Sequence, residues 1–300
     1  MKAALYRSTG KAADVLHVEE IPRPEPGPGE VLVRVYASGI NPTDYKARSG
    51  AVPRPIDEFQ IPHHDGAGVI ESAGPGVAPG RVGQRVWIYM AAAGRRWGTA
   101  AEWTVVPERQ AVPLPDNASF ELGAQLGVPA MTAHYCLFCD GPVNGKTVLV
   151  AGGAGSVGHF AIELAQRAGA RVVTTVSGPE KAALAEEAGA EEVVNYRSPD
   201  AVDQIKASGP VDRVIEVALG RLLLGEDPGV FGPAPEDLGA DPVASAAAVT
   251  RTAAPVRAFV DAAEVPAGHI AGRTLPERMD ARRDHVADGN NGNNNYQYHA

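Results

Sequence analysis

The fold of this chain is decided by the stretch Thr147-Val148-Leu149-Val150-Ala151-Gly152-Gly153-Ala154-Gly155-Ser156-Val157-Gly158. It passes from a short apolar strand through a glycine-rich turn into a helical segment. Gly153, Gly155 and Gly158 have the spacing G-x-G-x-x-G, in which the first glycine permits a tight turn, the second lets the backbone approach a pyrophosphate, and the third lets the helix pack closely on the strand. We therefore predict a dinucleotide site, with the pyrophosphate on the free N–H groups at the start of the helix.

The surroundings of this motif strengthen the prediction. Glycine accounts for 34 of the 300 residues, so the spacing alone is weak and a purely structural glycine turn is the alternative. A second strand, predicted from Arg171 to Val176, completes a βαβ unit of about 30 residues, which is the expected context for the motif.

Strands and helices continue to alternate after this unit. Strands are predicted at residues 192–196 and 212–217, with a helix from Pro179 to Ala188 before them. This alternation is typical of a doubly wound parallel sheet. Upstream of residue 118, short strands are separated by turns rich in proline and glycine, which predicts a small barrel-like all-β domain. The predicted fold class is thus α/β, with a β domain before the parallel sheet.

Composition excludes several classes of function. The chain is 44% hydrophobic and 21% charged, with a formal net charge of −9, as expected for a globular protein that is not a general nucleic-acid or membrane-surface binder. The N-terminus turns polar too early for a signal peptide, and no apolar run approaches the ~20 residues of a membrane span. We expect a cytoplasmic protein.

The two cysteines, Cys136 and Cys139, form a C-x-x-C in a segment predicted to be helix interior. A thioredoxin-like pair would instead follow a strand at the start of a helix. Two cysteines alone cannot complete a structural zinc site. We predict that they are small buried thiols.

The end of the second predicted strand indicates which dinucleotide binds. NAD sites usually place an acidic residue there to bind the ribose 2′-hydroxyl. This chain has Ser177 and, one step later, Lys181, a hydroxyl and a cation that suit a 2′-phosphate. We therefore predict NADP(H), with Glu180 placed in the helix and facing solvent. The alternatives are that Ser177 caps a helix and that Lys181 is a solvated surface charge.

The chain resembles the zinc-independent NADPH:quinone oxidoreductases (zeta-crystallin-like) of the medium-chain dehydrogenase/reductase superfamily. The resemblance covers about residues 1–219. It rests on the glycine motif and on four further segments, Ala37-Ser38-Gly39-Ile40-Asn41-Pro42-Thr43-Asp44, Asp65-Gly66-Ala67-Gly68-Val69-Ile70, Val128-Pro129-Ala130-Met131-Thr132-Ala133 and Val193-Val194-Asn195-Tyr196-Arg197.

The resemblance implies a GroES-like β-barrel domain at residues 1–118 and a Rossmann domain at 119–245, whose end after residue 219 is atypical. It also implies an NADPH site in the cleft between them and usually a homodimer. A helical segment at 246–288 and a disordered tail at 289–300, which is rich in asparagine, are expected to follow.

The resemblance also assigns residues to the site. Asn41 and Tyr45 would line the nicotinamide and substrate cleft, and Thr132 would lie close to the nicotinamide. The 2′-phosphate would be held by Ser177, Lys181 and Tyr196. The pyrophosphate would be held by Gly153, Ala154, Gly155, Ser156, Val157 and, through close helix packing, Gly158. Without the resemblance, an asparagine in a turn, an aromatic packed on the barrel and a strand-end tyrosine are the alternatives.

A metal is not expected. Zinc-dependent relatives place a cysteine where Asn41 stands, Gly-His-Glu near His63-His64-Asp65, and another ligand near Val128. His64 and Asp65 alone could coordinate at these positions, whereas a catalytic zinc needs three protein ligands.

The function implied is direct hydride transfer from NADPH to a quinone or another conjugated carbonyl, for which the protein aligns donor and acceptor. An enone or alkenal reductase would use the same site. The other alternative is a homologue that binds NADP without turnover, because residues after Leu219 lack the family's usual ending. We hypothesise that a reading-frame disturbance or a divergent insertion has altered this region.

Overall fold

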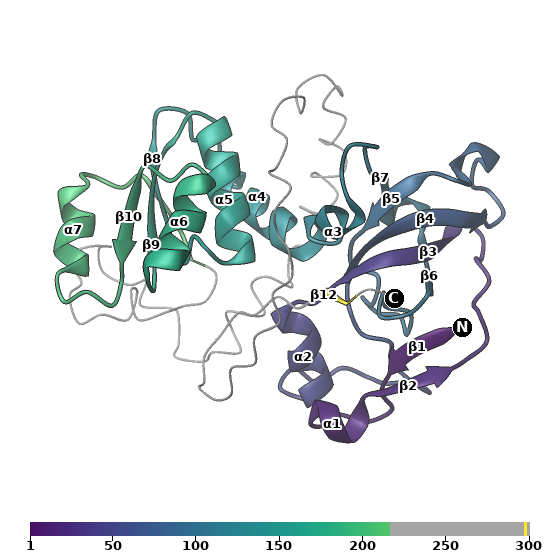
Figure 1. The fold of residues 1–300 in the computed structure, drawn as a ribbon. Coiled ribbons are helices and arrows are strands. Elements are labelled where there is room, and N and C mark those ends of the chain that lie inside the picture. The colour runs from purple at the N-terminus through teal and green to yellow at the C-terminus, as the bar shows by residue number, and fades with distance from the viewer. Residues whose placement is uncertain (217–296, 299–300) are drawn as a thin grey trace. The chain divides into compact units, whose positions relative to one another are not determined.

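The computed structural model describes residues 1–216 and 297–298 (Figure 1). The predictions for residues 217–296, including the end of the second domain and the helical segment at 246–288, lie outside the described residues. Within the described part, no helix is both long and apolar enough to cross a membrane.

An antiparallel sheet forms the core of the N-terminal part, as predicted (Figure 1). Its central strand, β3 (Glu30–Gly39), pairs with β4 on one side and with β6 on the other. Strand β4 also pairs with β5, and β5 with β7. The remaining strands of this sheet are β4 (Asp65–Ala73), β5 (Arg85–Ile88), β6 (Trp103–Pro107) and β7 (Ala111–Pro113).

Strand β3 shows why this part folds as a β domain. Val31, Val33 and Val35 alternate along the strand, and all three are buried, as the alternation predicts. Leu32 is buried too, so the start of the strand is covered on both faces. The cluster beneath the sheet consists of Val31, Val33, Ile70, Val77, Val86, Ile88, Ala91, Val106 and Ala111.

The shorter elements of this part complete the domain. Strands β1 and β2 pair with each other as a separate antiparallel ribbon. These elements are β1 (Lys2–Leu5), α1 (Ala12–Val15), β2 (His17–Glu20), α2 (Pro42–Ser49), and the 3₁₀ turns η1 (Pro79–Arg81) and η2 (Glu108–Gln110).

Two residues of the predicted disordered tail are ordered in the structure. Gln297–Tyr298 form β12, which pairs antiparallel with Ser38 and Gly39. Strand β6 covers β3 only as far as Arg34, so the far end of β3 offers unpaired backbone groups on that side. An open sheet edge is a template for another strand. The prediction of a structureless tail is therefore wrong at these two positions.

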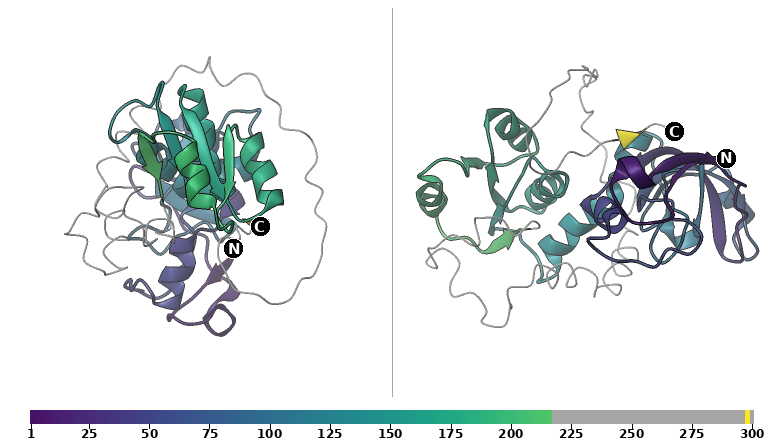
Figure 2. Two further views of the ribbon diagram at one scale, coloured as in Figure 1. Left: turned by 90° about the vertical axis from the view of Figure 1, so that its left-hand side faces the viewer. Right: turned by 90° about the horizontal axis from the view of Figure 1, so that it is seen from below.

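The second sheet is parallel and has the order β10-β9-β8-β11 (Figures 1 and 2). The chain moves outward from β8 to β10 and then returns to the other side of β8. This is the start of the doubly wound order, and ligands bind where the order reverses, at the carboxyl end of β8. The strands are β8 (Thr147–Val150), β9 (Arg171–Val176), β10 (Glu192–Asn195) and β11 (Arg213–Ile215), within a residue or two of the prediction.

Helices pack on this sheet through small apolar side chains. Helix α5 (Ser156–Arg167) lies against β8 and β9, and α6 (Pro179–Glu187) lies against β9 and β10. Helix α7 (Ala201–Ala207) packs on β10. The buried cluster includes Val148, Val150, Ala161, Ile162, Ala165, Val172, Ala185 and Ile215.

A broken helical segment precedes the parallel sheet. Ser119 caps α3 (Phe120–Gly123) by accepting a hydrogen bond from the Leu122 N–H at 3.1 Å. The helix ends at Gly123, and a π turn, η3 (Leu126–Ala130), leads into α4 (Met131–Phe138). Within η3 the backbone leaves helical geometry at Gly127 (φ −65°, ψ −107°), so one continuous helix is not formed.

The cysteines lie in and just after α4, as expected, but they are not both buried. Cys136 is half-buried, and Cys139 is exposed at the end of the helix. Both are free thiols. The prediction of two buried thiols is therefore wrong for Cys139, because the last turn of α4 turns its side chain toward solvent.

Candidate functional site

The glycine turn follows β8 and is tied to the neighbouring strand. Gly152 has a positive φ of 69°, which makes it the left-handed residue of the turn. The Gly153 N–H donates to the Thr175 carbonyl at 3.1 Å, and the Gly152 N–H donates to the Thr175 hydroxyl oxygen at 3.2 Å. The glycine spacing predicts the tight bend at Gly153, whereas the structure places it one residue earlier.

Gly153 and Gly158 are required by close packing instead. A Cβ on Gly153 would lie 2.1 Å from the Thr174 hydroxyl oxygen, and one on Gly158 would lie 2.3 Å from the Gly152 carbonyl oxygen. The Thr174 hydroxyl is itself fixed, because it donates to the Val150 carbonyl at 2.7 Å. The helix α5 can therefore pack against the glycine turn after β8 only if both positions are glycine. For Gly158, the third glycine of the motif, this is the role that the spacing predicts.

The start of α5 has the free backbone N–H groups on which the predicted anion site depends. Gly155 is the N-cap residue, and its N–H donates to the Gly152 carbonyl at 2.8 Å. The first-turn N–H groups belong to Ser156, Val157 and Gly158, and such groups have no acceptor within a helix. They lie at the carboxyl end of β8, where the strand order reverses. These residues fit the diphosphate bridge of a dinucleotide.

Of the three residues predicted for the 2′-phosphate, two follow adjacent strand ends and the third lies in a helix. Ser177 follows β9, and the Tyr196 N–H donates to the Val176 carbonyl at 3.0 Å, which brings the end of β10 beside it. Lys181 is exposed in the first turn of α6. The N-cap of this helix is Gly178, so Ser177 is not the cap. Glu180 is exposed inside the helix, as expected.

In the N-terminal part, Asn41 is held by a buried carboxyl group. The Asn41 Nδ2 donates to Asp65 Oδ2 at 2.8 Å, and the Val128 N–H donates to the same oxygen at 2.8 Å. Asn41 is 4% exposed and Asp65 is fully buried. Asp65 thus connects Asn41 to Val128 in η3, and Val128 lies four residues before Thr132 in the sequence.

The other Asp65 oxygen has no partner. Oδ1 makes no hydrogen bond within residues 1–216 and 297–298, and a Cβ on Gly127 would lie 2.1 Å from it. Burial raises the pKa of Asp65 to about 8, and the hydrogen bonds from Asn41 and Val128 oppose this only in part. The group is therefore mainly protonated at neutral pH. Because Oδ2 accepts two hydrogen bonds, the proton belongs on Oδ1.

The two other residues predicted for the substrate cleft differ in exposure. Tyr45 lies in α2 and is 51% exposed, so its side chain is not packed on the β domain. Thr132 is half-buried in the first turn of α4. Among the described side chains, no hydrogen bond joins Tyr45 or Thr132 to Asn41.

The side chains at the candidate metal-ligand positions contact other residues. His64 Nε2 lies 3.2 Å from an Arg54 nitrogen, and Asp65 Oδ2 holds Asn41 and Val128. Over the described ranges, no three His, Cys, Asp or Glu side chains are grouped as a metal site requires. The residues seen here do not fit a catalytic zinc.

The sequence does not indicate two sets of residues that shape the site. Thr174 and Thr175 hold the glycine turn from β9, although a pair of threonines in a strand gives no sign of this in the sequence. The sequence marks Asp65 only as a candidate metal ligand. Its position at the start of an apolar strand, after two histidines, is a signal of burial that could have been used.

Two family descriptions match the sequence. Residues 27–116 match the alcohol dehydrogenase GroES-like domain, and residues 156–223 match the zinc-binding dehydrogenase domain. An alcohol dehydrogenase from Geobacillus stearothermophilus is 34% identical over 245 residues, which cover 74% of this chain and 72% of that protein. The chain belongs to the medium-chain dehydrogenase/reductase superfamily. The GroES-like domain and the Rossmann-type sheet predicted from the sequence are confirmed.

Quinone oxidoreductases are also among the similar members of the superfamily. The one from Rattus norvegicus is 34% identical over 204 residues, covering 67% of this chain and 61% of that protein. The crystal structure of the quinone oxidoreductase from Thermus thermophilus, described with its NADPH complex, is 32% identical with a TM-score of 0.63. That match covers 74% of this chain and 68% of the other. This chain thus spans about six tenths of the length of the rat relative.

Proposed function

We propose that this protein reduces quinones or related conjugated carbonyl compounds with NADPH, by direct hydride transfer and without zinc. The observation that carries the proposal is the glycine turn at the carboxyl end of β8, with Lys181 on the neighbouring helix. Membership of the superfamily supports it, as do relatives named quinone oxidoreductase and a similar structure described with NADPH.

The cofactor would be held by residues of the parallel sheet. Ser156, Val157 and Gly158 would bind the diphosphate through their backbone N–H groups, and Ser177, Lys181 and Tyr196 would bind the 2′-phosphate. When bound, a nicotinamide supplies a hydride to the acceptor. The protein's own contribution is then to hold and orient the reactants and to keep water out.

Asn41 is the side chain best prepared for an orienting role. Its amide is fixed by Asp65, so little conformational entropy is lost when it contacts a ligand. Tyr45, exposed on the helix that begins after Asn41, would cover the acceptor. A reduced quinone can take its protons from solvent, so the proposal needs neither a metal nor a dedicated general acid.

A second candidate is a protein that binds NADP(H) without turnover. It is favoured by the extent of the matches, because the family domain ends at residue 223 and only 61% of the rat relative is covered. An enone or alkenal reductase would share the same nucleotide site and differ in the acceptor pocket.

One titration series separates these candidates. The full chain is titrated with NADPH and with NADH, and 1,4-benzoquinone or a simple enone is then added while NADPH absorbance is followed. Oxidation with quinone supports the proposal, and oxidation with the enone alone supports the reductase alternative. Tight binding without oxidation supports the inactive homologue, and no binding of either dinucleotide refutes all three.

Replacing Lys181 with alanine is expected to weaken NADPH binding while leaving NADH binding almost unchanged. Lys181 is exposed in the first turn of α6, where its charge can reach a phosphate beyond the end of β9. A hydrogen bond to a charged group contributes about 1.5–3 kcal/mol, so the Kd for NADPH should rise at least about tenfold. Fluorescence titration of both nucleotides measures the effect.

The matched control is Lys206→Ala, which removes the same charge from the last turn of α7. It should leave both affinities unchanged. Equal losses of NADPH and NADH affinity in the Lys181 variant would contradict the assignment of Lys181 to the 2′-phosphate.

A further inference from the structure

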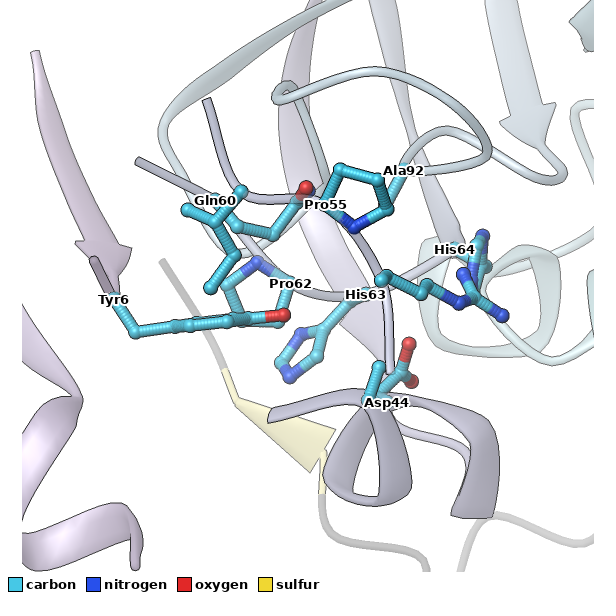
Figure 3. Close-up of a pocket in the computed structure, with 11 residues that line it drawn as sticks. Tyr6, Asp44, Pro55, Gln60, Pro62, His63, His64 and Ala92 are labelled. Atoms are coloured by element: carbon cyan, nitrogen blue, oxygen red, sulfur yellow. The ribbon is translucent and has the colours of Figure 1, made fainter. Parts of the chain in front are cut away.

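Two free thiols lie together at the end of helix α4, and neither of them lines the pocket shown in Figure 3. We propose that Cys136 and Cys139 form a dithiol site that closes reversibly into a disulfide by exchange with low-molecular-weight disulfides, with Cys139 reacting first. The inference does not depend on the proposed function, because the reaction needs neither a nucleotide nor a quinone.

Helix geometry brings the two cysteines within the range of a bridge. Cys136 lies in α4, and Cys139 is its C-cap residue, with backbone angles that are still helical (φ −57°, ψ −29°). Residues three apart in an α-helix have Cα atoms about 5 Å apart, which lies inside the range of about 4.4–6.8 Å found for disulfides. Their Cβ atoms must come roughly 1 Å closer, and the end of a helix permits such a shift more readily than its interior.

The side chain of Cys139 already lies back over the preceding turn. Its Sγ is 4.0 Å from the Cys136 carbonyl oxygen. This direction is general, because side chains on a helix lean toward its N-terminus. The Cys139 thiol also acts electrostatically on the Cys136 thiol, whose pKa it helps to raise. The two sulfur atoms are therefore neighbours, and no other element has to move to bring them together.

Exposure decides which thiol reacts first. Cys139 is exposed, whereas Cys136 is half-buried and packs against the apolar cluster between α4, α5 and the parallel sheet. A peptide-sized disulfide can therefore reach Cys139 directly. Cys136 is reached most easily by the sulfur three residues away. Cys139 is thus the attacking thiol, and Cys136 is the resolving thiol.

The exchange proceeds in two balanced steps. The Cys139 thiolate attacks one sulfur of the small disulfide, a new S–S bond forms, the old S–S bond breaks, and one small thiolate leaves. The Cys136 thiolate then attacks the Cys139 sulfur, which forms the internal disulfide and releases the second small thiolate. The two thiol protons pass to the two released thiolates. Two cysteine thiols are oxidised, and one small disulfide is reduced by two electrons.

The surroundings of the pair favour the closed form but slow its formation. Burial and the neighbouring Cys139 raise the pKa of Cys136. Burial and Asp140 raise the pKa of Cys139, and Arg213 opposes this in part. Stabilised thiolates make a disulfide easy to reduce, and this pair lacks that stabilisation, so its disulfide should resist reduction. The same raised pKa values leave little thiolate at neutral pH, so the exchange should be slow.

The test equilibrates the full chain with mixtures of reduced and oxidised glutathione, labels the remaining thiols with N-ethylmaleimide, and measures the intact mass. The chain has two cysteines, so each product has its own mass. As the oxidised fraction increases, the doubly labelled chain should be replaced by a monomer that carries neither maleimide nor glutathione. Subsequent treatment with dithiothreitol should restore the doubly labelled chain.

Two serine variants form a matched pair that tests the order of attack. Cys136→Ser should stop at a mixed disulfide, with one glutathione on Cys139. Cys139→Ser should react with oxidised glutathione at least about tenfold more slowly, because its one thiol is half-buried. Circular dichroism checks that both variants keep the helix content of the unmodified chain.

The other outcomes would overturn the inference. An unmodified chain that stays doubly labelled, or that ends as a glutathione adduct, would show that the two thiols do not form the internal bridge. A disulfide-linked dimer on a non-reducing gel would refute closure within one chain. Equal reaction rates in the two serine variants would refute the assignment of Cys139 as the attacking thiol.

Discussion

Replacing Gly158 with alanine is expected to weaken NADPH binding strongly and to lower the stability of the protein. The new Cβ would lie 2.3 Å from the Gly152 carbonyl oxygen and 2.9 Å from Gly153 Cα, so it would meet backbone on both contacts. Helix α5 must then move away from the turn, and its first N–H groups move with it. Overpacking of this kind costs about 1–3 kcal/mol or more, and we expect the Kd for NADPH to rise about 100-fold.

Gly80→Ala is the matched control for this substitution. No atom lies within 4 Å of a Cβ placed on Gly80, and its φ is not positive. Its affinity for NADPH and its midpoint of urea unfolding should remain those of the unmodified protein. If Gly158→Ala bound NADPH normally, the close approach of α5 to the glycine turn would not be required for the site.

The second large effect concerns Asp65, whose replacement by alanine and by asparagine should have opposite consequences. Asp65→Ala leaves the Asn41 Nδ2 and the Val128 N–H buried without an acceptor. At about 1–3 kcal/mol for each unsatisfied group, the loss of stability should be about 2–6 kcal/mol. Asp65→Asn retains one oxygen for both donors and resembles the protonated carboxyl group, so it should fold normally.

The asparagine variant should also change how stability depends on pH. The pKa of Asp65 is about 8 in the folded protein and near 3.8 when unfolded, so between these values the folded state binds more protons. Stability then falls as pH rises from about 4 to about 8, at most by about 1.4 kcal/mol per pH unit. Asp44, whose pKa is raised to about 7, acts electrostatically on Asp65, so the difference between the two proteins reports the ionisation of Asp65 together with its coupling to Asp44.

Urea unfolding at pH 5.5 and pH 8.5 measures this difference. Asp65→Asn should gain stability relative to the unmodified protein at the higher pH. An identical pH dependence in the two proteins would mean that Asp65 ionises normally in the folded state, and the assignment of the proton to Oδ1 would then be wrong.

The sequence predicted the layout of the parallel-sheet part well because its signals are local. Gly158 and its spacing from Gly153 are set by contacts between a turn and the helix that follows it directly. The positions of Lys181 and Glu180 in α6 followed from a proline at the helix start and the period of the helix. The difference here is small: the bend lies at Gly152 and not at Gly153. The sequence does not show this, because the Gly152 N–H donates to Thr175, which lies on another strand.

The sequence predicted less of the N-terminal site, because its contacts join residues far apart in the chain. Asn41, Asp65 and Val128 are separated by 24 and 63 residues, and nothing local to any of them indicates that they share one oxygen. The exposure of Cys139 and the break at Gly127 likewise depend on how α4 and η3 are placed on neighbouring elements.

By itself, then, the amino-acid sequence determined the class of fold, the position of the glycine turn and the family, since these depend on short-range spacing and on the period of apolar residues. The tertiary structure alone decided that Asp65 is a buried anchor for Asn41 and Val128, and that Thr175 on β9 holds the glycine turn. Those properties arise when burial removes water from groups that are distant in sequence, so that each must find a partner in the fold or remain without one.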